Sequence, residues 1–310
     1  MFVTLVAVIV ALVLGHVAPS LAASVRHFDW YDTWLRWLDG RLAQNDLWRG
    51  RYGIAFGLVP PLLAVALFQV ALDAPLLGLV GLLFGIVVLF YAWGPRDLDL
   101  DVDAIVEASD PLARREAAAR LSPLGADDAQ DERATVLDGP ALVGAVFRNA
   151  LQRWFGVLFW FLLLGPFGAL LYRLVALAAE GEPRRALPPE AAAGAQNLLI
   201  LLDWPVAQLM TLSMALVGNF DTVVGAWKDA GGASLQLDTG FLAAAGRASV
   251  RSELADEAQE FSEEGVSTAT GIVTQLGELP ELRDAMSLVW RILLVWLAVL
   301  ALFVVAGWVS

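Results

Sequence analysis

The chain has 310 residues, of which 58% are hydrophobic and only 17% charged, a composition typical of membrane proteins rather than soluble domains. Its net charge of −13 argues against nucleic acid as a partner. With no cysteine and only His16 and His27, the sequence excludes disulfides and thiolate metal sites and leaves little material for a histidine-based triad. We expect no cofactor and no metal.

The N-terminal region predicts a membrane helix followed by an aromatic helix. Residues 2–18 are apolar and slightly short for a bilayer core that takes about 20 residues. A signal peptide is the alternative, but the positive n-region of such a segment is missing. In residues 26–51, Trp30, Trp34 and Trp37 recur at helical spacing with arginines between them. This pattern favours a helix at the membrane interface over one packed only on protein.

Two apolar runs, residues 53–72 and 75–93, follow with two residues between them and predict a tight helical hairpin. We expect Pro60 and Pro61 to kink the first span. Gly78, Gly81 and Gly85 offer a small-residue face on the second, where a homodimer could form. Residues 94–150 are polar and predicted to be mostly helical.

The apolar stretch 151–180 is interrupted at residues 165–168 by Gly-Pro-Phe-Gly. It is either one long kinked span or a re-entrant hairpin, and interrupted helices need protein or a cavity to satisfy their backbone. Arginine-bearing segments at 19–52, 94–150 and 184–291 belong on the cytosolic side by the positive-inside rule. Keeping all three there requires the 151–180 segment to re-enter.

The C-terminal part contains one interrupted apolar segment, one polar segment and one membrane helix. Residues 197–221 are apolar but carry Asp203 and Pro205, which favours a packed or interfacial helix over a full span. Residues 228–285 are polar and predicted to be helical, and 286–310 form a strong membrane helix.

The predicted fold is therefore all-α, a polytopic membrane bundle with four to five membrane-inserted segments and helical polar regions. We divide it into residues 1–93 (membrane helix, interfacial helix and hairpin), 94–150 (polar cytosolic helices), 151–227 (broken or re-entrant segment and packed helix), 228–285 (polar helices) and 286–310 (C-terminal membrane helix).

A ladder of acids follows the second hairpin helix: Asp97, Asp99, Asp101 and Asp103 alternate with apolar residues directly after Arg96. The period of two predicts a half-buried extended segment with its acids facing water. A calcium loop is rejected, because the glycine and glutamate that it requires are absent. A looser Mg²⁺ site is the alternative.

A second polar group surrounds the interrupted segment. Arg148 and Asn149 precede it, and Arg173 lies inside it, where an ionisable residue indicates function by default. Asp203, Asn219 and Asp221 bracket the next apolar stretch and could meet these arginines. No phosphate-binding loop, zinc-protease helix or serine-nucleophile elbow is present.

Several stretches resemble the AmpE family, inner-membrane proteins associated with regulation of β-lactamase induction, within the wider CobD/CbiB group. They are GPRDLDLDV, the run from Arg148 to Leu174, LLDWPVAQL and the last membrane helix, so the resemblance covers nearly the whole chain. Cobalamin-pathway members of that group join an aminopropanol unit to adenosylcobyric acid with ATP and Mg²⁺.

The pattern of those synthases is matched here only in part. The matching positions are Asn149, Leu158 to Trp160, Gly165, Gly168, Ala169, Tyr172 and Arg173. The acids are replaced: Gly144 and Arg148 stand where two glutamates would be, and Gln152 stands for an aspartate. Ala176 and Ala179 replace a later Asn and Asp. The resemblance thus implies a retained scaffold without the carboxylates that Mg²⁺–ATP chemistry needs.

We therefore expect a non-catalytic inner-membrane regulator or sensor of the AmpE type, multi-pass in a bacterial inner membrane. The alternative is a membrane-bound ATP- and Mg²⁺-dependent amide-forming synthase of the CobD/CbiB type. Expected partners are the lipid bilayer and a signalling protein or small polar ligand. The acidic ladder is predicted to mark the membrane exit and to lie close to the arginines as a recognition surface. The candidate binding residues are Arg96, Asp97, Asp99, Asp101, Arg148, Asn149, Arg173, Asp203, Asn219 and Asp221.

Overall fold

The computed structural model describes residues 2–17, 24–72, 78–94, 97–121, 139–234, 236–263 and 279–306. These ranges are almost entirely helical and contain no strand, which confirms the all-α prediction. The elements are α1 (Phe2–Val17), α3 (Asp29–Leu42), α4 (Asp46–Arg49), α5 (Ile54–Leu72), α6 (Gly78–Ala92), α7 (Leu98–Val106), α8 (Pro111–Ala119), α9 (Gly139–Ala150), the π-helical turn η3 (Leu151–Phe155), α10 (Gly156–Leu164), α11 (Pro166–Glu180), the 3₁₀ turn η4 (Glu182–Ala186), α12 (Pro189–Val217), α13 (Phe220–Asp229), α14 (Gly240–Glu263) and α16 (Pro280–Val305).

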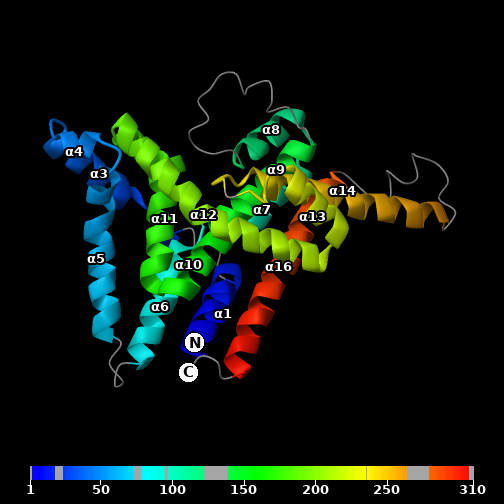
Figure 1. Ribbon diagram of the computed structural model, residues 1–310, viewed down its shortest axis with the longest axis horizontal. Helices are drawn as coiled ribbons and strands as arrows, with labels where there is room; N and C mark the ends of the chain where they lie inside the picture. Colours follow the sequence, from blue (N-terminus) through cyan, green and yellow to red (C-terminus); the bar gives the residue numbers. More distant parts are fainter. Residues whose placement is uncertain are drawn as a thin grey trace.

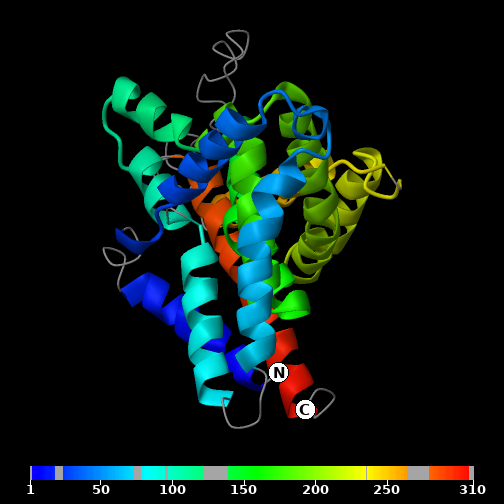
Figure 2. The ribbon, with the colours of Figure 1, turned by 90° about the vertical axis from the view of Figure 1, so that its left-hand side faces the viewer.

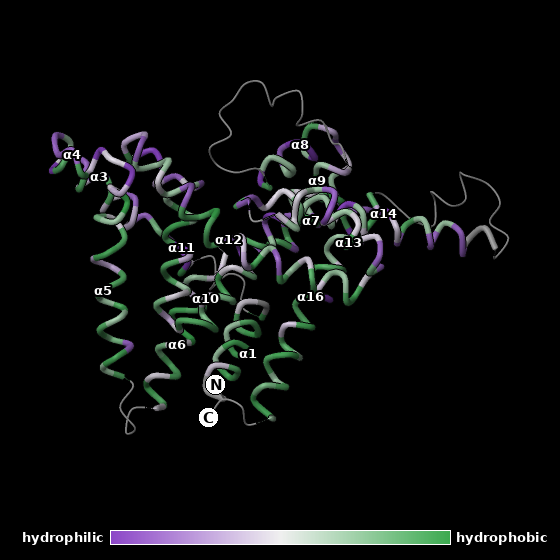
Figure 3. Tube along the Cα trace, in the orientation of Figure 1, coloured by the Kyte–Doolittle hydropathy of each residue, from purple (hydrophilic) through white to green (hydrophobic). Residues whose placement is uncertain are grey.

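The helices form an apolar layer and a polar layer. Helices α1, α5, α6 and α16 run side by side through the lower, apolar half, where α1 begins and α16 ends at the bottom (Figures 1 and 2). Helices α3, α4, α7, α8 and α14 lie above them, where hydrophilic residues are frequent (Figure 3). Among the described residues, α5, α12 and α16 are long and apolar enough to cross a membrane, and α1 and α6 are shorter apolar helices. The chain is thus a membrane protein with helical spans.

The aromatic segment packs on protein through one face and leaves indoles exposed on the other. In α3, Tyr31 and Leu35 are fully buried, and the indole N–H of Trp34 donates to the carbonyl of Gly57 in α5 at 3.2 Å. On the other face, Trp30 and Trp37 are 41% and 48% exposed. The helix therefore packs on α5 through one side and presents amphipathic rings on the other, as indoles at a headgroup level do.

The interrupted segment is a helical hairpin rather than one continuous helix. Helices α10 and α11 are antiparallel partners: a Cβ on Gly156 would overlap the ring of Tyr172, and a Cβ on Gly168 would overlap the carbonyl of Trp160. The chain reverses at Gly165, whose φ of 69° favours glycine. The hairpin returns its C-terminal end to the polar layer, which is what the arginine distribution requires.

The hairpin tip is held by one side chain from another helix. The amide of Gln69, one turn from the end of α5, donates to the carbonyl of Leu164 at 3.1 Å and accepts from the N–H of Phe167 at 3.0 Å. Both backbone groups belong to the break between α10 and α11 and have no water to bond in a bilayer core. Gln69 thus satisfies the interrupted backbone within the apolar layer.

Two boundaries differ from the sequence-based expectation. Helix α12 begins at Pro189 and continues to Val217 through Pro205, so that Asp203 does not break it. It runs obliquely across the front of the molecule in Figure 1, and half of its most apolar window is buried in the protein. Helix α16 begins at Pro280, earlier than predicted, and its first turn belongs to the polar layer. Helix α5 likewise continues through Pro60 and Pro61.

Candidate functional site

The carbonyl end of α6 is bonded by guanidinium groups from two distant parts of the chain. Arg26, in the connection between α1 and α3, donates through Nε to the carbonyl of Phe90 at 3.0 Å and through Nη1 to that of Gly94 at 3.1 Å. Arg173 of α11 donates through Nε to the carbonyl of Ala92 at 2.6 Å. A helix C-terminus carries unpaired carbonyls and partial negative charge, so it attracts cations. Buried arginines therefore complete this helix end.

The acidic ladder is a helix, and the prediction of an extended segment with alternating faces was wrong. Asp97 is the N-cap of α7, its carboxylate accepting from the N–H of Asp99 at 3.2 Å. Leu98, Val102 and Ile105 are buried at helical spacing, whereas Leu100 is 59% exposed. Acids at an N-cap and in a first turn favour a helix because they face its positive end. This local effect outweighs the period-two pattern.

The acids of the ladder have separate roles. Asp101 is buried and pairs with Arg153 at 2.6 Å between Nη1 and Oδ2. Asp99 accepts from the indole N–H of Trp290 in α16 at 3.0 Å. Asp103 is exposed. The ladder therefore joins α7 to η3 and α16 and does not face water as a unit.

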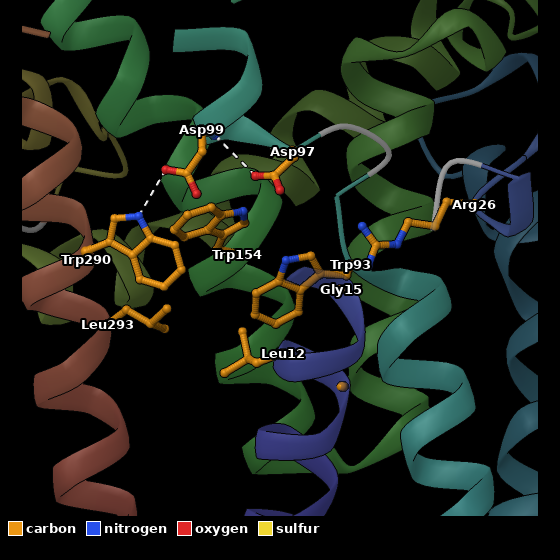
Figure 4. Close-up of a pocket in the computed structure, with 10 residues that line it drawn as sticks. Leu12, Gly15, Arg26, Trp93, Asp97, Asp99, Trp154, Trp290 and Leu293 are labelled. Atoms are coloured by element: carbon orange, nitrogen blue, oxygen red, sulfur yellow. Dashed lines mark hydrogen bonds between the residues drawn. The ribbon is translucent and has the colours of Figure 1, made fainter. Parts of the chain in front are cut away.

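A small cavity opens at the junction of α1, α7 and α16 (Figure 4). Its volume is about 40 Å³. Asp97 and Asp99 lie at its upper side, Trp290 at one end and Arg26 at the other, with Leu12 and Leu293 below (Figure 4). The other lining residues are Ala11, Gly15, Trp93 and Trp154. Acidic, basic and aromatic groups therefore meet at the boundary between the polar and apolar layers.

Arg26 provides the unusual feature of this cavity. Its side chain is buried, with 8% of the residue exposed, and its Nη2 atom has no hydrogen-bond partner among the residues that the structure describes. Burial lowers the pKa of Arg26, and the nearby charge of Asp97 raises it. Because arginine keeps its charge in proteins, Nη2 remains a charged donor that lacks an acceptor. A buried donor in this state indicates room for an oxygen ligand or water.

The predicted cluster of Arg148, Asn149 and Arg173 does not form. Arg148 is half-exposed and contacts Glu180 at 3.4 Å, and Glu180 also accepts from Gln152 at 3.0 Å. Asn149 donates to the carbonyls of Leu121 and Ala145 at 2.7 and 2.8 Å. Arg173 faces the end of α6 instead. The residue that links this region to the acidic ladder is Arg153, which the sequence reasoning did not select.

The remaining candidates are separate from the cavity. Asp203 is buried in α12 and accepts from the hydroxyl of Tyr172 at 2.5 Å. Asn219 caps α13 by accepting from the N–H of Thr222 at 3.1 Å, and Asp221 is exposed in the first turn of that helix. Arg96 lies outside the described residues. The expectation that Asp203, Asn219 and Asp221 meet the arginines therefore fails for the two helix-start residues, which stabilise α13.

The described part of the chain offers no group of three or more His, Asp or Glu side chains arranged to hold a metal ion. Comparison of the chain with protein-family models, with characterised proteins and with solved structures gives no match. The function must therefore be inferred from the geometry.

Proposed function

We propose that this chain is a non-catalytic regulatory or sensor protein of a bacterial inner membrane, of the AmpE type and linked to β-lactamase induction and cell-wall stress. The observation that carries this proposal is the structural use of the residues that match the synthase pattern. Asn149 and Arg173 are bonded to backbone carbonyls, and Tyr172 to the buried Asp203. Groups committed to the scaffold are not available for a reacting substrate.

The residues that stand in place of the acids also support a non-catalytic function. Arg148 and Gln152, which stand at acidic positions of that pattern, both bond Glu180. A cation in place of a carboxylate disfavours Mg²⁺ close by, because like charges repel. This supports loss of the nucleotide chemistry and retention of the bundle.

The boundary cavity supplies the sensing part of the proposal. Its lining comes from five parts of the chain: α1, the connection from α1 to α3, the end of α6 with the start of α7, η3 and α16. A ligand bound there contacts spans and polar layer together, so its binding energy can favour one arrangement of these elements over another. Ligand occupancy at this cavity is thus the proposed input to signalling.

The test is β-lactamase induction in cells that carry the chromosomal gene for this chain, with the gene deleted and restored as variants. Asp97→Asn with Asp99→Asn removes both negative charges of the cavity. It keeps the N-cap of α7, because asparagine caps a helix as well as aspartate does. We expect impaired induction at an unchanged amount of protein in the membrane. Asp103→Asn, an exposed acid of the same helix, is the matched control and should behave as wild type.

Induction that is unchanged in the double variant would contradict the role of the cavity, and unchanged induction in the deletion strain would contradict the regulatory function itself. Purified chain that consumes ATP with Mg²⁺ in the presence of an amine and a carboxylic acid would favour the synthase alternative.

A further inference from the structure

We propose that the boundary cavity binds the headgroup of an aminophospholipid, with the primary ammonium between the aspartates and indoles and the phosphate oxygen at Arg26. This rests on the proposed function, because it names the ligand of the same cavity. The two ends of the cavity, its size and its position all support this ligand.

One end of the cavity has the chemistry of an ammonium site. Asp97 and Asp99 provide two carboxylates, and the rings of Trp154 and Trp290 lie 5.1 Å apart between centroids beneath them. Aromatic faces attract cations, most strongly where water is excluded. With one arginine and two aspartates, the lining itself carries one net negative charge. A monocation neutralises it.

The other end has the chemistry of an oxyanion site. Two nitrogens of Arg26 are bonded to α6, and the third, Nη2, is buried without an acceptor. It lies beside Gly15, where an added Cβ would stand 3.2 Å from it. Guanidinium groups bind phosphate oxygens strongly through charge-assisted hydrogen bonds. The phosphate of an ethanolamine headgroup, two carbons from its ammonium, would supply such an oxygen to Nη2.

The size of the cavity selects among headgroups. A volume of about 40 Å³ holds about three water-sized groups, since one water needs 10–15 Å³. This matches the nitrogen and two carbons of an ethanolamine unit. Choline adds three methyl groups to the same nitrogen and exceeds the space. Glycerol headgroups lack the cation that the two carboxylates require.

The position of the cavity indicates a lipid rather than a soluble amine. Leu12 and Leu293 form its lower side, toward the apolar layer (Figure 4). Below it, the outer faces of α1 and α16 are apolar and open: Val13 is 54% exposed, Leu294 61% and Leu302 68%. Acyl chains can lie along these faces while the headgroup enters between the two helices, at the level where headgroups occur.

The test is native mass spectrometry of the purified full-length chain in detergent, titrated with phosphatidylethanolamine, phosphatidylcholine or phosphatidylglycerol of identical acyl chains. We expect the ethanolamine lipid to bind at least about tenfold more tightly than the other two, a ratio typical of one cation–aromatic and charge contact at a desolvated site. Asp97→Asn with Asp99→Asn should abolish this preference, and Gly15→Leu should block binding by filling the space beside Arg26. Asp103→Asn should bind as wild type.

Equal binding of the three lipids, or a preference that survives in the double variant and in Gly15→Leu, would overturn the proposal. Competition with soluble phosphoethanolamine distinguishes a lipid ligand from a soluble amine. We expect that millimolar phosphoethanolamine does not displace the lipid; displacement together with no preference among the lipids would assign the cavity to a free amine. Lipid binding is measured on purified protein and induction is measured in cells, so a failure of lipid binding can be distinguished from a failure of the proposed regulatory function.

Discussion

Removing the side-chain amide of Gln69 should loosen the re-entrant hairpin. In Gln69→Leu, the carbonyl of Leu164 and the N–H of Phe167 lose their hydrogen bonds to the Gln69 amide, which are 3.1 and 3.0 Å long in the wild type. Each buried backbone group left unpaired costs about 1–3 kcal/mol, and hydrogen bonds in membrane bundles often lie at the low end. We therefore expect a loss of about 2–4 kcal/mol in the free energy of unfolding, since two groups are affected.

The measurement is reversible unfolding in mixed micelles with increasing SDS, followed by tryptophan fluorescence. Val70→Leu, an exposed neighbour on the same helix, controls for a substitution in α5. Gly165→Ala should cause a similar loss by an independent route, because its φ is 69° and its Cβ would lie 2.9 Å from the Gln69 amide. A loss below about 0.5 kcal/mol in Gln69→Leu, or an equal loss in Val70→Leu, would refute the reasoning.

Three further predictions concern the hairpin, the buried ion pair and the orientation of the chain. Gly156→Ala should destabilise the protein by about 1–3 kcal/mol in the same SDS assay, because a methyl group there overlaps the packed ring opposite; an unchanged midpoint would contradict the close contact of α10 and α11. Asp101→Leu should lower the free energy of unfolding by about 3–5 kcal/mol, because the Arg153 guanidinium loses its carboxylate partner and keeps only its bond to the carbonyl of Arg120. Adding Arg153→Met should recover most of this loss; a double variant as unstable as the single one would show that the pair is not the cause. Since the chain has no cysteine, Ser234→Cys should react with an impermeant maleimide only from the cytosolic side; labelling only from the opposite side would exclude the re-entrant topology.

Composition and long apolar runs were enough to predict the helical class and the main membrane segments. The interruption at Gly165 and Pro166, together with the arginine distribution, also indicated the re-entrant hairpin. The acidic ladder does not form the extended segment that we predicted, because alternation over the seven residues from 97 to 103 resembles a strand. The N-cap aspartate before Leu98 was the contrary signal, and caps decide short helices more strongly than alternation does.

The composition of the cavity could not be predicted from the sequence, because its parts are distant along the chain. The indole of Trp290 and the carboxylate of Asp99 are 191 residues apart, and Arg26 and Phe90 are 64 apart. Sequence reasoning placed Arg26 in an interfacial helix, where an exposed arginine is ordinary. Only packing shows that it is buried and that one of its nitrogens lacks an acceptor. Similarly, no local pattern distinguishes Arg153, whose side chain is 12% exposed, from Arg148, whose side chain is 52% exposed.

The arginines at the end of α6 impose an order on the synthesis of the protein. Arg26 precedes Phe90 by 64 residues, so it is already made when α6 leaves the ribosome. Arg173 follows Ala92 by 81 residues, so the carbonyl of Ala92 cannot accept this hydrogen bond until α11 has been synthesised. A guanidinium entering the membrane is costly until it finds its acceptor. The N-terminal helices must therefore be in place before the hairpin can insert, and a chain stopped before residue 173 leaves the end of α6 incompletely bonded.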